Sequence, residues 1–166
     1  MDEARLRELY DVSYRRLVGQ LAAFTGSLAE AEDVVQEAFV RAIGRGERLD
    51  AVDNPEAWLL TVAVNLARSR WRRVRRLAGL LPHLDTGDVP GVTPDRVALV
   101  AALRSLPATQ REAIALHHLA DLSVDQVAHT LGVPSGTVKA RLSRGRAALA
   151  ALLTDSSDSS EEVPRG

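Results

Sequence analysis

The stretch LSVDQVAHTLGVPSGTVKARLSRGRAAL, from Leu122 to Leu149, contains two short helical patterns separated by a glycine and a proline. Ser123, with a glutamine three residues later, has the pattern of a capping box and begins the first helix. Gly132 stands where a left-handed residue would end that helix, and the proline two residues on keeps its predecessor extended. We expect Ser135 to cap the second helix. The pattern predicts a helix-turn-helix.

The apolar positions of these two helices indicate which side of each is buried. Val127, Ala128 and Leu131 share one face of the first helix, and Val138 and Leu142 share one face of the second. The small side chain of Ala128 allows the two helices to approach closely.

The second helix carries basic and hydroxyl side chains on its remaining faces. Arginine and lysine bind phosphate or guanine, and serine and threonine bind phosphate or base edges. A structural helical hairpin would share the hydrophobic spacing, but the basic second helix favours DNA binding. The candidate DNA-binding residues of this helix are Ser135, Thr137, Lys139, Arg141 and Arg144.

Charge is unevenly distributed along the chain, although the formal net charge is only −1. Residues 1–67 carry seven arginines and twelve acidic residues, whereas residues 68–76, RSRWRRVRR, carry six arginines. Residues 134–146 carry four basic residues and no acid. Two basic segments in an acidic background are typical of surfaces that bind a polyanion, although a solvated helix face is the alternative for either segment alone.

The first half of the chain also has helical signals. Apolar spacing predicts a helix, or two short ones, over about residues 2–24. Ser27 and Glu30 form a second capping-box pattern, which begins a helix running to about Ile43. Its apolar positions 35, 38, 39 and 42 face inward, whereas four residues face outward: Asp33, Gln36, Glu37 and Val40. The polar segment GRGERLDAVDN that follows is predicted to be a loop.

A third helix is predicted to begin at Asn54, with Pro55 at its first position. Its apolar stripe continues into the arginine-rich segment, so that Trp71 and Val74 are expected to face the core. The helix macrodipole favours cations near a C-terminus by about 0.3–1 kcal/mol each. This explains one or two arginines but not six, because like charges one turn apart repel.

The overall prediction is an all-α protein of two small helical domains joined by a flexible linker. The predicted segments are a first domain at 1–77, a linker at 78–93, a second domain at 94–153 and a disordered acidic tail at 154–166. In the second domain one helix starts at Thr93-Pro94 and runs to about Leu106, and another runs from Pro107 to about Ala120. With the helix-turn-helix, this makes a four-helix domain.

Composition argues against several function classes. The chain has no cysteine, so it has neither a disulfide framework nor a thiolate metal site. His117 and His118 are adjacent on a helix and lie about 100° apart, which prevents both from binding one metal from the same face. No catalytic Ser/His/Asp order, glycine-rich phosphate loop or HExxH motif is present. We therefore expect no enzyme activity, no cofactor and no small-molecule substrate.

The sequence also indicates where the protein acts. The N-terminal segment MDEARLRELY is charged and lacks the apolar core of a secretory signal. The longest apolar runs have seven residues, far fewer than the roughly 20 needed to cross a bilayer. We expect a cytoplasmic protein without membrane insertion.

Residues 5–153 resemble an extracytoplasmic-function (ECF) sigma factor, the small two-domain class of bacterial RNA polymerase initiation factor. Three segments carry the resemblance by their order and spacing: AEDVVQEAFVRA, PEAWLLTVAVNLARSRWRR and LPATQREAIALHHLADLSVDQVAHTLGVPSGTVKARLSRGRAAL. The resemblance implies a protein that binds core RNA polymerase, directs it to promoter DNA by recognising the −10 and −35 elements, and assists strand opening. The alternative is a stand-alone helix-turn-helix regulator with a helical sensing domain.

The resemblance also implies roles for particular residues. The polymerase-binding residues would be Asp33, Gln36 and Glu37, and the −10 element would be bound by Asn65, Arg68, Arg72 and Arg73. The second domain would read the −35 element with its recognition helix. The loop from Arg48 to Asn54 resembles the segment that captures a flipped base, but it lacks the aromatic residue that the family often has there. Family members are commonly held inactive by an anti-sigma protein, which makes such a protein a candidate partner.

Overall fold

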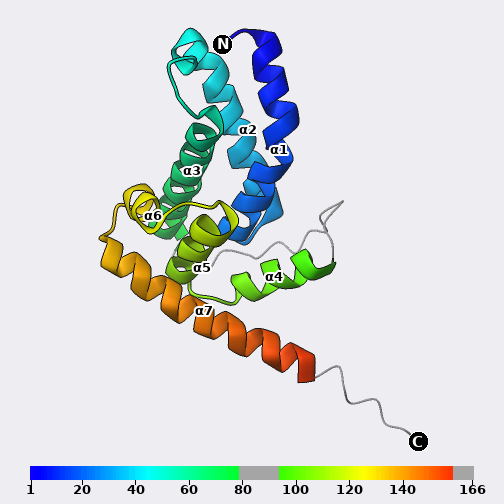
Figure 1. The fold of residues 1–166 in the computed structure, drawn as a ribbon, viewed down its shortest axis with the longest axis vertical. Coiled ribbons are helices and arrows are strands. Elements are labelled where there is room, and N and C mark those ends of the chain that lie inside the picture. The colour runs from blue at the N-terminus through cyan, green and yellow to red at the C-terminus, as the bar shows by residue number, and fades with distance from the viewer. Residues whose placement is uncertain (79–93, 159–166) are drawn as a thin grey trace, which may run out of the picture. The chain divides into compact units, whose positions relative to one another are not determined.

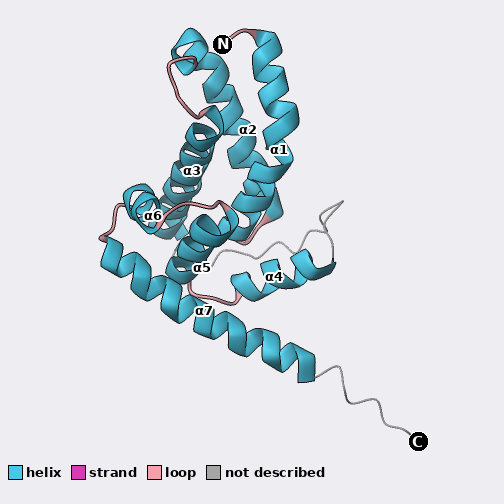
Figure 2. Ribbon diagram, viewed as in Figure 1, coloured by secondary structure: helices cyan, strands magenta, loops and turns pink. Residues whose placement is uncertain are grey.

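The computed structural model describes residues 1–78 and 94–158, which form helices joined by short loops (Figures 1 and 2). The described residues contain no strand, which confirms the predicted all-α fold class. The chain divides into two compact units, Met1–Pro90 and Gly91–Gly166. The predicted linker falls almost wholly outside the described residues.

The first unit is a bundle of three long helices, α1 (Glu3–Thr25), α2 (Leu28–Arg45) and α3 (Pro55–Ala78), which pack against one another (Figure 1). Leu17, Leu21, Val35 and Val64 are among the fully buried side chains at its centre. A bidentate pair joins α1 to the start of α3: the Arg16 guanidinium donates to both carboxylate oxygens of Glu56, at 2.7 and 2.5 Å.

Local signals set the ends of these helices as predicted. The Ser27 hydroxyl accepts a hydrogen bond from the backbone N–H of Glu30 at 3.2 Å, which caps α2. The predicted capping box is only half formed, because the N–H of Ser27 donates to the Thr25 hydroxyl and the Glu30 carboxylate accepts from Trp71. The Asn54 side chain accepts one from the N–H of Ala57 at 3.0 Å and so begins α3. α1 is a single helix that ends at Gly26, where φ is 77°.

Two features of the first unit differ from the prediction. Within the predicted polar loop, α2 continues to Arg45 and a 3-10 helix follows over Gly46–Leu49, because the Leu49 side chain is fully buried and anchors the segment. Val74 is 44% exposed, so the expectation that it faces the core is wrong. Trp71 contacts Glu30, which lies in the first turn of α2. Val74 lies about one turn further along α3 and is therefore past the end of α2.

The second unit consists of four helices in its described residues. These are α4 (Pro94–Arg104), α5 (Ala108–Ile114) with its π-helical continuation η2 (Ala115–Leu119), α6 (Val124–Leu131) and α7 (Ser135–Asp158). Their core includes Leu103, Leu116, Val127, Val138 and Leu142.

α7 extends further than expected from the sequence. The sequence predicts a disordered tail from residue 154, but the helix continues to Asp158. The hydroxyl of Thr154 donates to the carbonyl of Ala150 at 2.7 Å, within the helix. The alanine- and leucine-rich segment before it has a high helix propensity, which carries the helix into the first polar residues.

Among the described residues, no helix combines the length and the apolar character needed to span a bilayer.

Candidate nucleic-acid interface

The turn between α6 and α7 has the predicted helix-turn-helix geometry. The Ser123 hydroxyl accepts from the N–H of Gln126 at 3.1 Å, and the Gln126 side chain accepts from the N–H of Ser123 at 2.9 Å, so the capping box is complete. Gly132 ends α6 in the left-handed region, at φ 66° and ψ 36°. The N–H of Val133 then donates to the carbonyl of Ala128 at 3.0 Å, which closes the turn.

The start of α7 differs from the prediction by one residue. The carbonyl of Pro134 accepts from the N–H groups of Thr137 and Val138, at 3.0 and 3.3 Å. Because these bonds make Pro134 the residue that precedes the helix, Ser135 is the first helical residue and not the cap. Val138 and Leu142 are buried as predicted.

The five predicted DNA-binding residues of this helix all lie on the part of α7 that is not buried. Lys139 and Arg144 are exposed, and Ser135, Thr137 and Arg141 are half-buried. They span about 14 Å of helix at 1.5 Å per residue. A B-DNA major groove is about 12 Å wide and admits one α-helix. At 100° per residue, Ser135 and Lys139 lie on one side of the buried face of α7, and Thr137, Arg141 and Arg144 lie on the other, so basic side chains flank a helix of the right dimensions on two sides.

The four residues of α3 that are predicted to bind the −10 element differ in exposure. Asn65, Arg72 and Arg73 are exposed, whereas Arg68 is half-buried. One shallow surface depression is lined by Ser69, Arg72, Arg73, Arg76 and Leu77. The concentration of guanidinium groups around it suits a phosphate.

Arg70 and Trp71, in the same segment, contact α2. The indole N–H of Trp71 donates to Glu30 Oε1 at 2.8 Å, and Arg70 Nη1 lies 3.9 Å from Asp33 Oδ2. Sequence reasoning missed both contacts. Heptad-like spacing identifies which residues of a helix lie inward, but it does not identify their partners on another helix.

The outer face of α2 carries the three predicted polymerase-binding residues, but also apolar ones. Asp33 and Gln36 are exposed and Glu37 is half-buried. Gln36 Nε2 lies 3.4 Å from the Tyr14 hydroxyl, and Arg41 Nε lies 3.3 Å from Glu37 Oε1. Val40, predicted to face outward, is 60% exposed.

Two further apolar side chains of this region, Ile43 and Tyr10, are exposed. Ile43, in the last turn of α2, is 64% exposed. Tyr10 of α1 stacks on Tyr14, with ring centroids 4.6 Å apart, and its ring meets Phe39 edge-on at 5.0 Å. The face is therefore mixed, with acidic, amide and apolar groups that suit a protein partner better than a nucleic acid.

The predicted base-capture loop, Arg48 to Asn54, has an aromatic neighbour. Its own residues include no aromatic, but Trp58 lies in the first turn of α3 directly after it. The guanidinium of Arg45, directly before the 3-10 helix, lies over the Trp58 ring at 5.4 Å from the ring centroid. Trp58 is half-buried, so its ring is not wholly used in the core.

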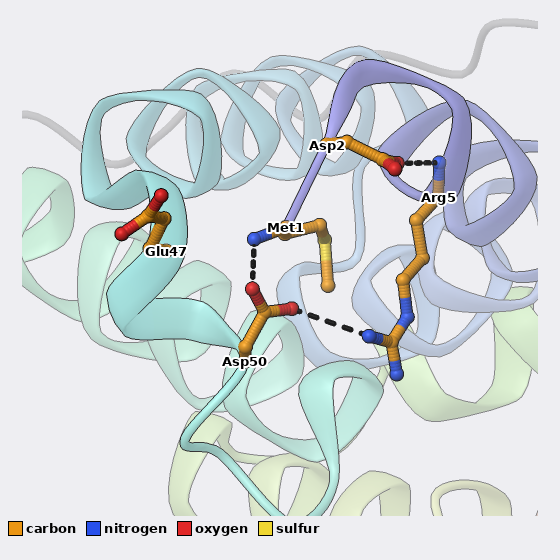
Figure 3. Close-up of a pocket in the computed structure, with 5 residues that line it drawn as sticks. All are labelled: Met1, Asp2, Arg5, Glu47 and Asp50. Atoms are coloured by element: carbon orange, nitrogen blue, oxygen red, sulfur yellow. Dashed lines mark hydrogen bonds and ion pairs between the residues drawn. The ribbon is translucent and has the colours of Figure 1, made fainter.

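Ionic contacts tie this loop to the start of α1 (Figure 3). The Asp50 carboxylate accepts from the Met1 amino group and from Arg5 Nη1, the latter at 3.3 Å. Asp2 caps α1 by accepting from the N–H of Arg5 at 2.8 Å. Glu47 completes the lining of this open, polar pocket. Met1, Asp2, Arg5 and Asp50 bond to one another, which makes the pocket a structural feature of the loop.

The adjacent histidines lie at the end of the α5–η2 helix. His117 Nδ1 lies 2.7 Å from the carbonyl oxygen of Leu122, and the two imidazole rings meet edge-on with centroids 4.8 Å apart. Partial desolvation lowers the pKa of His118, whose side chain remains largely exposed, with smaller contributions from His117 and Arg146. In the part of the chain that the structure describes, no three potential metal ligands come together.

Two family models match the chain, one in each unit. The Sigma-70 region 2 model matches residues 9–77, and the Sigma-70 region 4 model matches residues 96–149. The ECF RNA polymerase sigma factor SigL of Mycobacterium tuberculosis is 36% identical over 149 residues, covering 85% of this chain and 84% of SigL. The ECF RNA polymerase sigma factor SigW of Bacillus subtilis is 31% identical over 165 residues, covering 89% of this chain and 84% of SigW.

Solved structures of sigma factors share the fold. The sigma factor RpoE of Bartonella quintana, solved with the anti-sigma factor NepR, aligns with a TM-score of 0.71 at 27% identity over 89% of this chain and 96% of RpoE. CnrH, solved with the cytosolic domain of CnrY, aligns with a TM-score of 0.63 at 26% identity over 93% of this chain and 90% of CnrH.

These matches span both units. A stand-alone helix-turn-helix regulator would need a sensing domain in place of the first unit, but the first unit matches a sigma-70 region. That alternative is therefore not favoured. Three observations agree on the family of this chain. The second unit has a helix-turn-helix with a basic second helix, the first unit has an arginine-rich helix end, and the two units match sigma-70 regions 4 and 2. The chain belongs to the ECF sigma factors of the sigma-70 family, which are transcription initiation factors and not enzymes.

Proposed function

We propose that the two units divide the work of promoter recognition: the first binds core RNA polymerase and the −10 element, and the second binds the −35 element. The observation that carries the proposal is that each unit has a helix with several unburied basic side chains, α3 and α7, within a segment similar to a sigma-70 region. The proposed functional segments are 1–77 and 94–153, connected through 78–93 and followed by the acidic residues 154–166.

For the −10 element, Asn65, Arg68, Arg72 and Arg73 of α3 are the proposed DNA contacts. Duplex DNA carries one negative charge per about 1.7 Å of its axis, so several arginines on one helix end find separate phosphates. The repulsion among these arginines is relieved when they replace the counterions of the DNA. This accounts for the arginines that the macrodipole of α3 leaves unexplained.

For the −35 element, the proposed contacts lie on the unburied faces of α7. They are Ser135, Thr137, Lys139, Arg141 and Arg144. The residues near the helix N-terminus suit base edges and nearby phosphates, as in other helix-turn-helix proteins. The buried side chains of Val138 and Leu142 hold the helix on the unit.

For polymerase binding, we assign Asp33, Gln36 and Glu37 on the outer face of α2. The exposed side chains of Val40 and Ile43 extend this face with apolar area, which a protein partner can bury. Charged groups on such a face set orientation and partner choice, and apolar groups contribute affinity.

For strand opening, Trp58 is the proposed source of base stacking beside the Arg48–Asn54 loop. Base–aromatic stacking is worth about 1–3 kcal/mol per base. Trp71 is less suited to this role because its indole N–H is bound to Glu30. Arg45 lies over the Trp58 ring and could contribute a phosphate contact next to a stacked base.

The protein is proposed to act in the cytoplasm, where RNA polymerase is, and to be restrained by an anti-sigma factor. The similar sigma factor RpoE of Bartonella quintana was solved in complex with the anti-sigma factor NepR.

A pull-down of core RNA polymerase followed by run-off transcription tests the function. We expect the chain to bind core enzyme and to direct initiation on a matched promoter, with weak DNA binding by the chain alone. The Arg68/Arg72/Arg73 triple alanine variant should still bind core enzyme but initiate poorly. A chain that binds a promoter tightly by itself, and fails to bind core enzyme, would instead be a stand-alone regulator.

A further inference from the structure

Two neighbouring acids of α2 contact two neighbouring residues of the arginine-rich segment of α3. Glu30 accepts from the Trp71 indole N–H at 2.8 Å, and Asp33, three residues further along α2, lies 3.9 Å from Arg70 Nη1. Asp33 is also one of the residues proposed to bind polymerase. The face of α2 toward polymerase and the DNA-binding end of α3 therefore share one ion pair.

The two contacts differ in strength and exposure. The Trp71–Glu30 hydrogen bond is partly buried and short, so it fixes the rotation of this part of α3. The Arg70–Asp33 pair is solvent-exposed, with side-chain exposures of 42% and 68%, and it is long for an ion pair. Exposed pairs of this kind are weak and exchange partners easily. Arg70 can therefore leave Asp33 without disturbing Trp71.

The position of Arg70 in the charged segment makes this exchange useful. Arg72, Arg73 and Arg76 line the solvent-facing depression of α3, whereas Arg70 is held at the side of α2 by Asp33. A carboxylate next to a guanidinium competes directly with a DNA phosphate for it.

We propose that Asp33 couples polymerase binding to DNA binding by holding Arg70 in the free chain and releasing it to a promoter phosphate when a cationic side chain of the polymerase pairs with Asp33. This inference rests on the proposed function and adds a regulatory step to it. Because such coupling is reciprocal, DNA that takes Arg70 also leaves Asp33 available to polymerase. The Trp71–Glu30 bond keeps the other arginines in place during the exchange.

The expected size of the effect follows from the exposure of the pair. An exposed ion pair is worth at most about a fivefold change in an equilibrium constant. One additional phosphate contact makes the dependence of log K on log salt steeper by about 0.9. The slope is the more specific signal, because it counts phosphate contacts.

A charge-matched comparison in the free chain tests the proposal. The probe is a short, fluorescently labelled DNA duplex of arbitrary sequence, because phosphate binding does not depend on sequence. Its affinity is measured by anisotropy over a series of salt concentrations for Asp33→Asn and for the control Glu32→Gln, which removes one negative charge from the adjacent residue. Both are repeated in an Arg70→Ala background, and helix content is checked by circular dichroism.

We expect Asp33→Asn to bind the duplex up to about fivefold more tightly than Glu32→Gln, with a slope steeper by about 0.9. In the Arg70→Ala background the two variants should behave alike. Equal behaviour of Asp33→Asn and Glu32→Gln in the parent chain would overturn the proposal, and so would an Asp33→Asn effect that persists without Arg70.

A second measurement uses the complex with core polymerase. Arg70→Ala should lower the salt slope of promoter binding by about 0.9 in the complex and by less in the free chain. An equal change in both states would overturn the proposal. Failure of the parent chain to bind core enzyme would refute the proposed function instead, and the comparison in the free chain distinguishes the two.

Discussion

Gly145 lies inside α7, where this helix packs against α5. A Cβ added at this position would lie 2.5 Å from Ile114 Cδ1, 3.2 Å from Ile114 Cγ1 and 3.4 Å from Gln110 Cβ. Carbon atoms pack best at about 3.5–4.0 Å. Ile114 is only 4% exposed, so its side chain has little room to withdraw. We predict that Gly145→Ala destabilises the second unit, although alanine is the better helix former.

Two opposing effects set the magnitude. Adding a carbon to a packed interface costs about 1–3 kcal/mol. Replacing glycine by alanine inside a helix gains about 0.8–1 kcal/mol. The smallest overpacking cost is cancelled by the gain in helix propensity, and the largest leaves a net loss of about 2 kcal/mol.

A second substitution separates the two effects. Ile114→Val removes the clashing Cδ1 atom and costs about 0.5–1.5 kcal/mol by itself. In that background Gly145→Ala should be neutral or stabilising. Gly19, in α1, has no atom within 4 Å of an added Cβ, so Gly19→Ala serves as the control and should stabilise α1.

Amide hydrogen exchange measured by mass spectrometry is the suitable assay. Both tryptophans, Trp58 and Trp71, lie in the first unit, so tryptophan fluorescence does not report on the second. A decrease of about 1.4 kcal/mol in stability accelerates exchange about tenfold where exchange follows the opening equilibrium. We expect faster exchange in α5 and α7 for Gly145→Ala. If exchange in α7 slows instead, as in α1 of the Gly19→Ala control, the close packing of α5 and α7 at this point is refuted.

Three further predictions concern DNA binding, capping and pH. Replacing Arg68, Arg72 and Arg73 with alanine should lower the salt slope of promoter binding by about 0.9 for each phosphate that is no longer bound, and an unchanged slope in a salt titration would contradict the assigned DNA-binding residues. Ser123→Ala should destabilise α6 by about 0.5–2 kcal/mol while Ser123→Asp retains the cap, as measured by amide exchange in α6; equal exchange in both variants would argue against the capping box. Partial desolvation lowers the pKa of the largely exposed His118 in the folded chain below its ordinary value of 6.5, so that the unfolded chain takes up the proton first as the pH falls. The stability associated with neutral His118 is therefore present above pH 6.5 and lost as pH falls through the lower folded-state pKa. If the urea midpoints of unfolding decline equally with falling pH in the parent chain and in His118→Gln, this assignment is contradicted.

The local structure of the helix-turn-helix could be read from the sequence because its signals act over short distances. The Ser123 capping box and the left-handed Gly132 each depend on residues within one helical turn. The same holds for the starts of α2 and α3, where Ser27 and Asn54 cap the helices. The start of α7 was misplaced by one residue because a carbonyl, not the Ser135 side chain, accepts the first hydrogen bonds of that helix.

The candidate site was predictable only in part. Residue type and charge indicated the candidate DNA-binding residues of α7 and α3, because basic side chains are recognisable in the sequence and most of them are unburied. The apolar extension of the α2 face at Ile43 was not predicted, since an apolar residue at the end of an amphipathic pattern looks like a core position. Which of these residues contact DNA or polymerase stays a prediction.

By itself, the sequence determined the all-α class, most helix starts and the two basic segments, because hydrogen-bond capping and helical periodicity are set by neighbours in the chain. Only the tertiary structure decided that Arg70 and Trp71 contact acids of α2 while Arg72 and Arg73 face solvent, and that Val74 is exposed. The same is true of the close approach of Gly145 to Ile114. These features depend on where one helix crosses another, and that position is fixed by the packing of side chains far apart in the sequence.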